Sequence, residues 1–194
     1  MSTHYFRKSR FSDKQFISLS IHGQTLEFLT YSSLFSGRRV DLGTRLLLEY
    51  IRIPEKGVVL DVGCGYGVIG ITIAKLNSNL KVYMVDVNPL AVKVSRYNAK
   101  LNNVIDRVTI LEGDCYKPVE NILFQAIYSN PPLSAGRDIV ENIVLNAKKY
   151  LDTNGFAQFV IAQGREYIVN KAKQEYRIVE SINKKGYTVL YLKP

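Results

Sequence analysis

The chain has 194 residues, of which 46% are hydrophobic, and it carries a formal net charge of +9 at pH 7. This length and hydrophobic content predict one domain with a substantial core, and no stretch approaches the roughly 18 uninterrupted apolar residues of a membrane span. The start of the chain is basic and aromatic, without the apolar core of a secretory signal. We therefore expect a soluble protein of the cytoplasm.

The cysteines give no sign of a disulfide framework or a zinc site. Cys64 and Cys115 lie far apart in the sequence, form no CxxC pattern, and are accompanied by two histidines, His4 and His22. Structural zinc sites are usually signalled by closely spaced Cys and His ligands, which this chain lacks. We expect no metal.

The positive charge fits a polyanionic partner such as nucleic acid, which binds basic surfaces through its phosphates. Many small proteins are basic without binding anything acidic, so the charge by itself leaves both interpretations open. In residues 1–14, basic side chains alternate with Tyr5, Phe6 and Phe11. That mixture can pair with phosphates and stack on bases, and it also fits a frayed terminal arm.

The first predicted elements are a β-hairpin and a helix. Residues 16–35 alternate apolar and polar side chains around His22-Gly23-Gln24, the pattern of two antiparallel strands joined by a short turn. Residues 38–51 then change to helical spacing and stop before Pro54. We expect this segment, residues 1–56, to precede the main body of the domain.

From residue 57 the sequence alternates short apolar strands with amphipathic helices, which predicts a mostly parallel, doubly wound α/β sheet of Rossmann type. The last two strands are joined by the short turn 184–186, so we expect the sheet to end antiparallel. The predicted strands are 58–62, 81–87, 107–114, 124–129, 155–162, 176–182 and 187–192, and the predicted helices begin near 68 or span 89–102, 138–151 and 165–174.

A glycine-rich turn follows the first of these strands. Asp61 is followed by Gly63, Gly65 and Gly67, and glycines allow the backbone of such a turn to approach a ligand closely. Residues 65–70 formally match G-x-G-x-x-G, so a nicotinamide dinucleotide has to be considered. A carboxylate at this point argues against a pyrophosphate above the turn, because the two negative charges would repel.

Polar residues also close the next three strands, and ligands of such sheets sit at the carboxyl ends of the strands. Asp86 can accept two hydrogen bonds from a ribose diol, Asp114 can accept from an exocyclic amine, and Asn130-Pro131-Pro132 follows the fourth strand. Each of these groups could also be a helix cap or a turn former. Their joint occurrence at successive strand ends indicates one binding site.

These residues resemble a known family. The glycine-rich turn after Asp61, the acids Asp86 and Asp114, and Asn-Pro-Pro after strand four are similar to class I S-adenosyl-L-methionine-dependent methyltransferases that methylate amines. With 34–36 (Leu-Phe-Ser) and 40–44 (Val-Asp-Leu-Gly-Thr), the chain resembles the small-methyltransferase (MTS) domain over roughly residues 26–194. That domain occurs in small-subunit rRNA guanine-N2 methyltransferases and in stand-alone archaeal proteins.

The resemblance implies a seven-stranded methyltransferase fold in one domain, 1–194, with residues 57–194 as the cofactor-binding core. It implies that the glycines shape the pocket for the methionine part of the cofactor, that Asp61 helps to hold its ammonium, and that Thr44 contacts its carboxylate or shapes the entrance. The implied cofactor-binding residues are Thr44, Asp61, Gly63, Cys64, Gly65, Gly67, Asp86, Val87, Asn88, Asp114, Cys115 and Asn130.

Asn130, Pro131 and Pro132 are the expected catalytic residues. The Asn130 side-chain oxygen and the Pro131 carbonyl can accept from the two N–H groups of a planar amine and so favour a nitrogen whose lone pair points at the methyl donor. Proline donates no hydrogen bond and keeps the turn rigid. Where the family usually has an aromatic residue that stacks on the base, this chain has Leu133, so a stacking partner has to come from elsewhere, such as Phe35.

The expected function is methylation of an exocyclic amine of RNA, in the first place guanine N2 of rRNA, with Phe35, Leu133 and Arg137 contacting the substrate. A protein-glutamine N5-methyltransferase is an alternative, because it needs the same two hydrogen-bond acceptors around a carboxamide nitrogen. A cofactor-binding ribosome assembly factor without turnover and a nicotinamide oxidoreductase are further alternatives. The sequence gives no oligomeric state.

Overall fold

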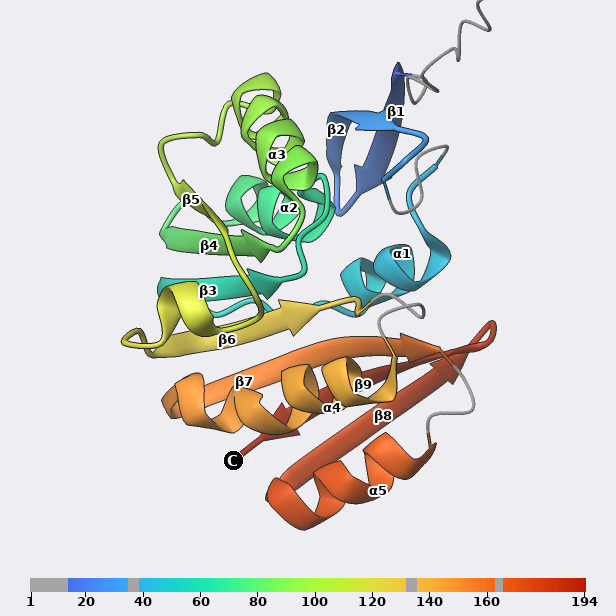
Figure 1. Cartoon of the computed structure of the whole chain (residues 1–194), viewed down its shortest axis with the longest axis vertical. Helices are drawn as coiled ribbons and strands as arrows, with labels where there is room; N and C mark the ends of the chain where they lie inside the picture. The colour runs from blue at the N-terminus through green and yellow to red at the C-terminus, as the bar shows by residue number, and fades with distance from the viewer. Residues whose placement is uncertain (1–13, 35–38, 132–135, 163–165) are drawn as a thin grey trace, which may run out of the picture.

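The structure is a computed structural model that describes residues 14–34, 39–131, 136–162 and 166–194. Seven strands form one sheet, in which β6 is the central strand and β3 lies next to it (Figure 1). They are β3 (Gly57–Val62), β4 (Leu80–Asp86), β5 (Val108–Glu112), β6 (Phe124–Ser129), β7 (Leu151–Ala162), β8 (Ile178–Lys184) and β9 (Tyr187–Lys193).

The strand order is β5–β4–β3–β6–β7–β9–β8. The first five of these strands pair in parallel, whereas β9 is antiparallel to both β7 and β8. The predicted doubly wound α/β sheet with an antiparallel last strand is confirmed. Because β3 pairs with β4 on one side and β6 on the other, the chain reverses its direction of winding at β3, where such sheets form their binding crevice.

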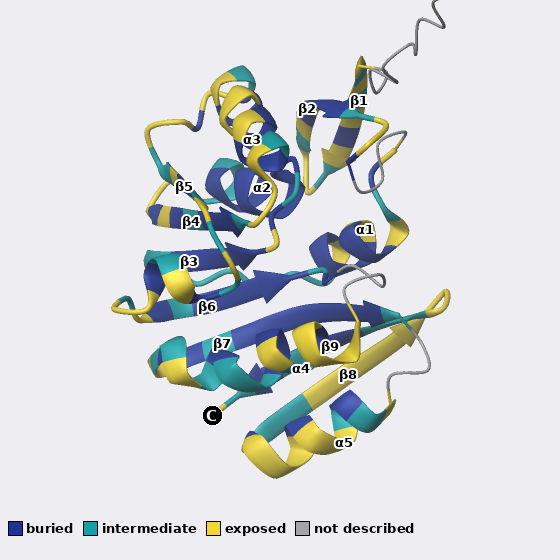
Figure 2. Ribbon diagram, in the orientation of Figure 1, coloured by how far each residue is buried: buried dark blue, intermediate teal, exposed yellow. Residues whose placement is uncertain are grey.

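Helices cover both faces of the sheet, and each face has its own hydrophobic cluster. On one face, side chains of α1 (Leu42–Glu49), α2 (Val68–Leu76) and α3 (Pro89–Leu101) pack on the sheet. On the other face, α4 (Arg137–Asn146) and α5 (Glu166–Glu175) do so. Figure 2 shows the buried strands between these two helical layers. Among the described residues, none of these helices is long and apolar enough to cross a membrane.

The predicted hairpin forms a separate two-stranded sheet of β1 (Lys14–Ile21) and β2 (Gln24–Tyr31). His22 and Gly23 connect the strands with positive φ angles of 46° and 73°, as a two-residue hairpin turn requires. The hairpin lies against α3 (Figure 1). This placement confirms the expected N-terminal hairpin extension.

Asn98 of α3 joins three parts of the chain. Its Oδ1 accepts from the Leu29 amide at 2.7 Å, and its Nδ2 donates to the carbonyls of Leu29 at 2.9 Å and Tyr66 at 2.8 Å. The side chain is 0% exposed, so no water can replace these bonds. Asn102, one turn later, makes a similar pair of bonds with the backbone of Glu27.

The sequence placed one helix end and one strand start wrongly. The predicted helix 138–151 is α4 followed by a 3-10 turn, η3 (Ala147–Tyr150), and β7 begins at Leu151 instead of 155. Residues 152–155 (Asp-Thr-Asn-Gly) are typical of a turn. In the structure they belong to β7, where the register of its pairing with β6 shifts between Phe124 and Ala126, so that residues 152–155 have no paired residue in β6.

Replacement of Asn98 by leucine keeps most of the side-chain volume but removes all three hydrogen bonds. We expect the free energy of unfolding to fall by about 3 kcal/mol or more, since each backbone group left unpaired in the interior costs roughly 1–3 kcal/mol. Urea denaturation of N98L measures the loss. Asn170→Leu, at an exposed position of α5, is the control and should change stability by less than about 0.5 kcal/mol. Equal stability of the two variants would contradict the role of Asn98.

Candidate active site

The turn between β3 and α2 presents bare backbone to solvent. Gly63 and Gly65 have φ angles of 69° and 56°, and a Cβ atom added at either position would meet no atom within 4 Å. Gly67 differs, because a Cβ there would lie 2.6 Å from Cδ1 of Ile71. The first two glycines leave space for a ligand, while Gly67 permits close packing of α2 on the turn.

A cavity of about 270 Å³ lies at this edge of the sheet. Ten of the twelve predicted cofactor-binding residues line it, and Asp61 and Gly67 do not. The lining residues that were predicted are Thr44, Gly63, Cys64, Gly65, Asp86, Val87, Asn88, Asp114, Cys115 and Asn130. The others are Leu34, Asp41, Val62, Tyr66, Val68, Ile69, Val85, Ala91, Gly113, Ile139 and Ile143.

The residues that the prediction missed are mostly apolar. Leu34 precedes α1, and Ile139 and Ile143 lie on α4, so both helical layers contribute to the cavity walls. Ile143 lies on the buried face of α4, whereas Leu34 belongs to no helix or strand and Ile139 is exposed, so no local pattern in the sequence indicated that they line a cavity. Together with the acids they make a cavity with apolar walls and few polar groups, as small-molecule sites usually are.

Asp61 lies beneath the glycine-rich turn. It is 0% exposed, and its Oδ2 accepts from the Gly70 amide at 2.9 Å. Its Oδ1 has no hydrogen-bond partner among the described residues. Burial, with a smaller contribution from the charge of Asp86, raises the pKa of this carboxyl to about 7. The resemblance implied that Asp61 helps to hold a ligand ammonium; in the structure its carboxyl is buried below the turn and is not part of the cavity lining.

Asp86 connects β4 to the glycine-rich turn. Its Oδ2 accepts from the Gly65 amide at 2.7 Å, and its Oδ1 accepts from the Asn88 amide at 2.9 Å. Asn88 in turn caps α3 by accepting from the Leu90 amide at 3.0 Å. Each carboxylate oxygen of Asp86 keeps a second acceptor position. The residue therefore holds the turn in shape and still faces the cavity with acceptors for hydroxyl groups.

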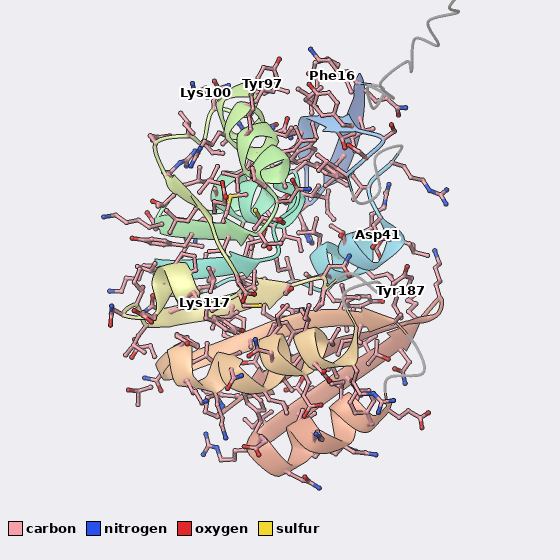
Figure 3. The ribbon with its side chains drawn as sticks, in the orientation of Figure 1. Phe16, Asp41, Tyr97, Lys100, Lys117 and Tyr187 are labelled. Atoms are coloured by element: carbon pink, nitrogen blue, oxygen red, sulfur yellow. The ribbon has the colours of Figure 1, made fainter. Side chains whose placement is uncertain are left out.

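Asp114 and Cys115 close the cavity on the β5 side. Asp114 forms an ion pair with Lys117 at 2.9 Å, and this hydrogen bond lowers the pKa of the Asp114 carboxyl. Figure 3 labels Lys117 close to this part of the sheet edge. Burial raises the pKa of the Cys115 thiol to about 12 and that of Cys64 well above its usual value, so both thiols stay protonated at neutral pH.

Asn130 is bound through its amide nitrogen to the start of α1. Nδ2 donates to Oδ2 of Asp41 at 2.8 Å and to Oγ1 of Thr44 at 2.8 Å. Thr44 lines the cavity as predicted, but the hydrogen bond that it makes is to Asn130. Pro131 follows and is buried. The side chain that the sequence predicted to be catalytic is thus held by residues almost ninety positions earlier in the chain.

The predicted substrate-binding residues are only partly covered by the structure. Phe35, Pro132 and Leu133 lie outside the described residues. Arg137 is the first residue of α4, and its guanidinium lies 4.6 Å from the ring centroid of Tyr167. It is exposed and does not line the cavity. Within the described ranges, no group of three His, Cys, Asp or Glu side chains could hold a metal ion.

The chain is similar to methyltransferases. The family model of the methyltransferase small domain (MTS) matches residues 25–191. An uncharacterized protein of Bacillus subtilis strain 168, YbxB, is 34% identical over 200 aligned positions, which cover 100% of this chain and 99% of YbxB.

Solved structures show the same fold at low identity. The T. thermophilus 16S rRNA N2 methyltransferase RsmC, in complex with AdoMet and guanosine, has a TM-score of 0.81 at 22% identity and covers 94% of this chain. The match covers 50% of RsmC, so the present chain spans half of that protein. A Pyrococcus furiosus methyltransferase has a TM-score of 0.70 at 20% identity, over 87% of this chain and 89% of its own.

Replacement of Asp61 by asparagine should make folding stability less dependent on pH. The folded protein holds the Asp61 proton up to a pH of about 7, whereas the ordinary pKa of an aspartate, as in the unfolded chain, is 3.8. The free energy of unfolding therefore decreases as the pH rises from about 4 to about 7, by at most about 1.4 kcal/mol per pH unit, and the decrease is complete above pH 7. An asparagine still accepts from the Gly70 amide and carries no charge.

Urea denaturation of the ligand-free wild-type and D61N proteins at pH 5 and pH 8 measures this effect. The wild-type protein should lose more stability between the two pH values than D61N. Comparison of the two proteins removes the contribution of all other titrating groups. An equal loss in both would show that Asp61 is ionised in the folded protein already at pH 5.

Proposed function

Since the chain belongs to the methyltransferase small domain family, we propose that it is an S-adenosylmethionine-dependent N-methyltransferase that acts on an exocyclic amine of RNA, specifically guanine N2 of ribosomal RNA. The observation that carries this proposal is the position of Asn130. Its amide reaches the same cavity as the glycine-rich turn and Asp86, so an amine-binding group and a cofactor site share one space.

The cavity suits this cofactor by shape and charge. S-adenosylmethionine supplies a methyl group on a positively charged sulfur. The bare backbone at Gly63 and Gly65 leaves room for its methionine part, and the acceptors of Asp86 match the two ribose hydroxyls. Asp41, Asp86 and Asp114 line the cavity. Although the protein as a whole is basic, these carboxylates favour a cationic ligand at this edge of the sheet.

The chain's own contribution to the reaction is alignment. The Asn130 Oδ1 and the Pro131 carbonyl accept from the two N–H groups of the substrate amine and hold its nitrogen toward the methyl donor. Tyr66 and Ile143 contribute to the walls of the same cavity. Neither thiol is a nucleophile at neutral pH, since burial raises the pKa of both Cys64 and Cys115.

Two observations favour RNA as the substrate. The net charge of +9 fits a partner with many phosphates. RsmC, whose fold matches 94% of this chain, is a 16S rRNA N2 methyltransferase in complex with guanosine. The same fold also serves a ribosomal protein L11 methylase from Lactobacillus delbrueckii, with a TM-score of 0.68. A protein carboxamide or amine is therefore the competing substrate, and a cofactor-binding assembly factor is the competing non-enzyme.

Titration calorimetry with S-adenosylmethionine and with NAD tests the cofactor. We expect saturable binding of S-adenosylmethionine and none of NAD. Gly65→Ala should weaken that binding about tenfold or more, because the added methyl group projects into the cavity. Gly23→Ala is the matched control, since Gly23 also has a positive φ and open space around it but lies in the hairpin turn. If both variants bind S-adenosylmethionine with the same affinity, the cofactor does not bind at the glycine-rich turn.

Transfer of a labelled methyl group tests the reaction. The purified protein is incubated with labelled cofactor and with rRNA, small ribosomal subunits, tRNA or ribosomal proteins. Label in rRNA or subunits, recovered as N2-methylguanosine, is the expected result. Asn130→Ala should lower the transfer rate by about 100-fold or more while cofactor affinity stays within about threefold, because the residue acts on the amine. Label found only in protein would contradict RNA as the substrate and support a protein amine or carboxamide. Absence of label from every acceptor would favour a cofactor-binding assembly factor without turnover.

A further inference from the structure

We propose that Asp41 and Thr44 are positioning residues that fix the orientation of the Asn130 amide, so that its carbonyl oxygen faces the substrate amine. This inference rests on the proposed function, since it concerns the group that would accept from that amine. It assigns Thr44 to the positioning of Asn130, whereas the family resemblance implied that Thr44 contacts the cofactor's carboxylate or shapes the entrance.

The hydrogen bonds at Nδ2 determine which end of the amide faces α1. An ionised carboxylate only accepts, so the Asn130 atom that lies 2.8 Å from Asp41 Oδ2 has to be the nitrogen. The second hydrogen on that nitrogen goes to Thr44 Oγ1, also at 2.8 Å. Both hydrogens of the amide are used on this side, which leaves Oδ1 as the free end.

Rotation of the amide by 180° would be unfavourable. It would bring the Asn130 oxygen against the Asp41 carboxylate and turn the NH₂ group toward the cavity. An NH₂ group there cannot accept from a substrate amine and would repel its N–H groups. Asparagine needs such an external constraint, because its own two amide ends have nearly the same shape.

Asp41 is itself held in place from two further directions. As the N-cap of α1, its Oδ2 also accepts from the Thr44 amide at 3.0 Å. Tyr187, at the start of β9, lies beside it, and Figure 3 labels both side chains at this edge of the sheet. Burial, and then the charge of Asp41 and a hydrogen bond to it, raise the pKa of the Tyr187 hydroxyl. The Asp41 carboxylate thus joins α1, the residue that follows β6, and the first residue of β9.

Gly43 makes this arrangement possible. A Cβ atom at Gly43 would lie 2.8 Å from Cε1 of Tyr187 and 2.9 Å from Asp41 Oδ2. Any larger residue would push the tyrosine and the carboxylate apart. The stretch Asp41-Leu-Gly43-Thr44 therefore supplies a carboxylate, the space around it and a hydroxyl, each directed at the same small volume.

Two substitutions separate positioning from general folding. Asp41→Ser keeps a side-chain acceptor for the helix cap but is too short and uncharged to hold the Asn130 amide. Thr44→Val keeps the side-chain shape without the acceptor, and Thr44→Ser restores the acceptor. We expect D41S and T44V each to lower the single-turnover rate constant by about tenfold or more, with cofactor affinity within about threefold, and T44S to stay close to wild type.

A double-mutant cycle with Asn130→Ala gives the decisive readout. If Asp41 and Thr44 act through the Asn130 amide, D41S and T44V have no further effect on the rate once that amide is absent. A merely structural role would lower the rate by the same factor in both backgrounds, and that result would overturn the proposal. If T44V loses cofactor affinity by as large a factor as it loses rate, Thr44 binds the cofactor and does not act through Asn130.

Nuclear magnetic resonance tests the positioning even where no RNA accepts a methyl group. The Asn130 side-chain NH₂ signals are identified by their loss in N130A. In the wild-type protein we expect slow exchange of these hydrogens with solvent, and in D41S and T44V exchange at least about tenfold faster, close to that of the exposed Asn170. Equal exchange in all these proteins contradicts the proposal, while absent methyl transfer with protected NH₂ signals contradicts only the proposed function.

Discussion

The pairing of β3 with β4 on one side and β6 on the other is the constraint on which the site depends. Parallel strands end at the same edge, so the turns after β3, β4, β5 and β6 meet although they are spread over some seventy residues of sequence. Hydrogen bonds from backbone amides then fix the relative positions of these turns. Asp86 bonds to the Gly65 amide, and Gly63 bonds to the Val85 carbonyl. The location of the cavity is therefore determined by the order of the strands in the sheet, and the side chains determine which ligand it can bind.

Charge is distributed unevenly on this framework. The chain as a whole is strongly basic, yet its cavity is lined by acids and has a further carboxylate, Asp61, buried below the glycine-rich turn. A long polyanion is attracted by the outer surface and repelled by the cavity, whereas a small cation is attracted by the cavity. If the substrate is RNA, as proposed, its phosphates and the cationic cofactor are therefore separated by sign of charge as well as by size.

The sequence predicted the sheet, the hairpin and ten of the cavity-lining residues, because strand periodicity and the polar residues at strand ends are local signals. What it missed is non-local. The direction in which Asp61 points depends on the packing of α2 above it, and the contact of Thr44 with Asn130 joins positions 86 residues apart. The early start of β7 was missed for a similar reason, since residues 152–155 favour a turn and only the pairing of the residues on either side of them with β6 makes them part of a strand.

The hydrogen bonds of Asn98 determine whether the N-terminal hairpin can be removed without loss of stability. One side chain joins β2 at Leu29, the glycine-rich turn at Tyr66 and α3. The hairpin is therefore bound to α3 and to the glycine-rich turn, although it precedes them in sequence and forms a sheet of its own. A fragment that starts at residue 57 would lack both partners at Leu29 and expose the apolar surface of α3. We therefore expect the hairpin and the rest of the chain to unfold in one cooperative transition.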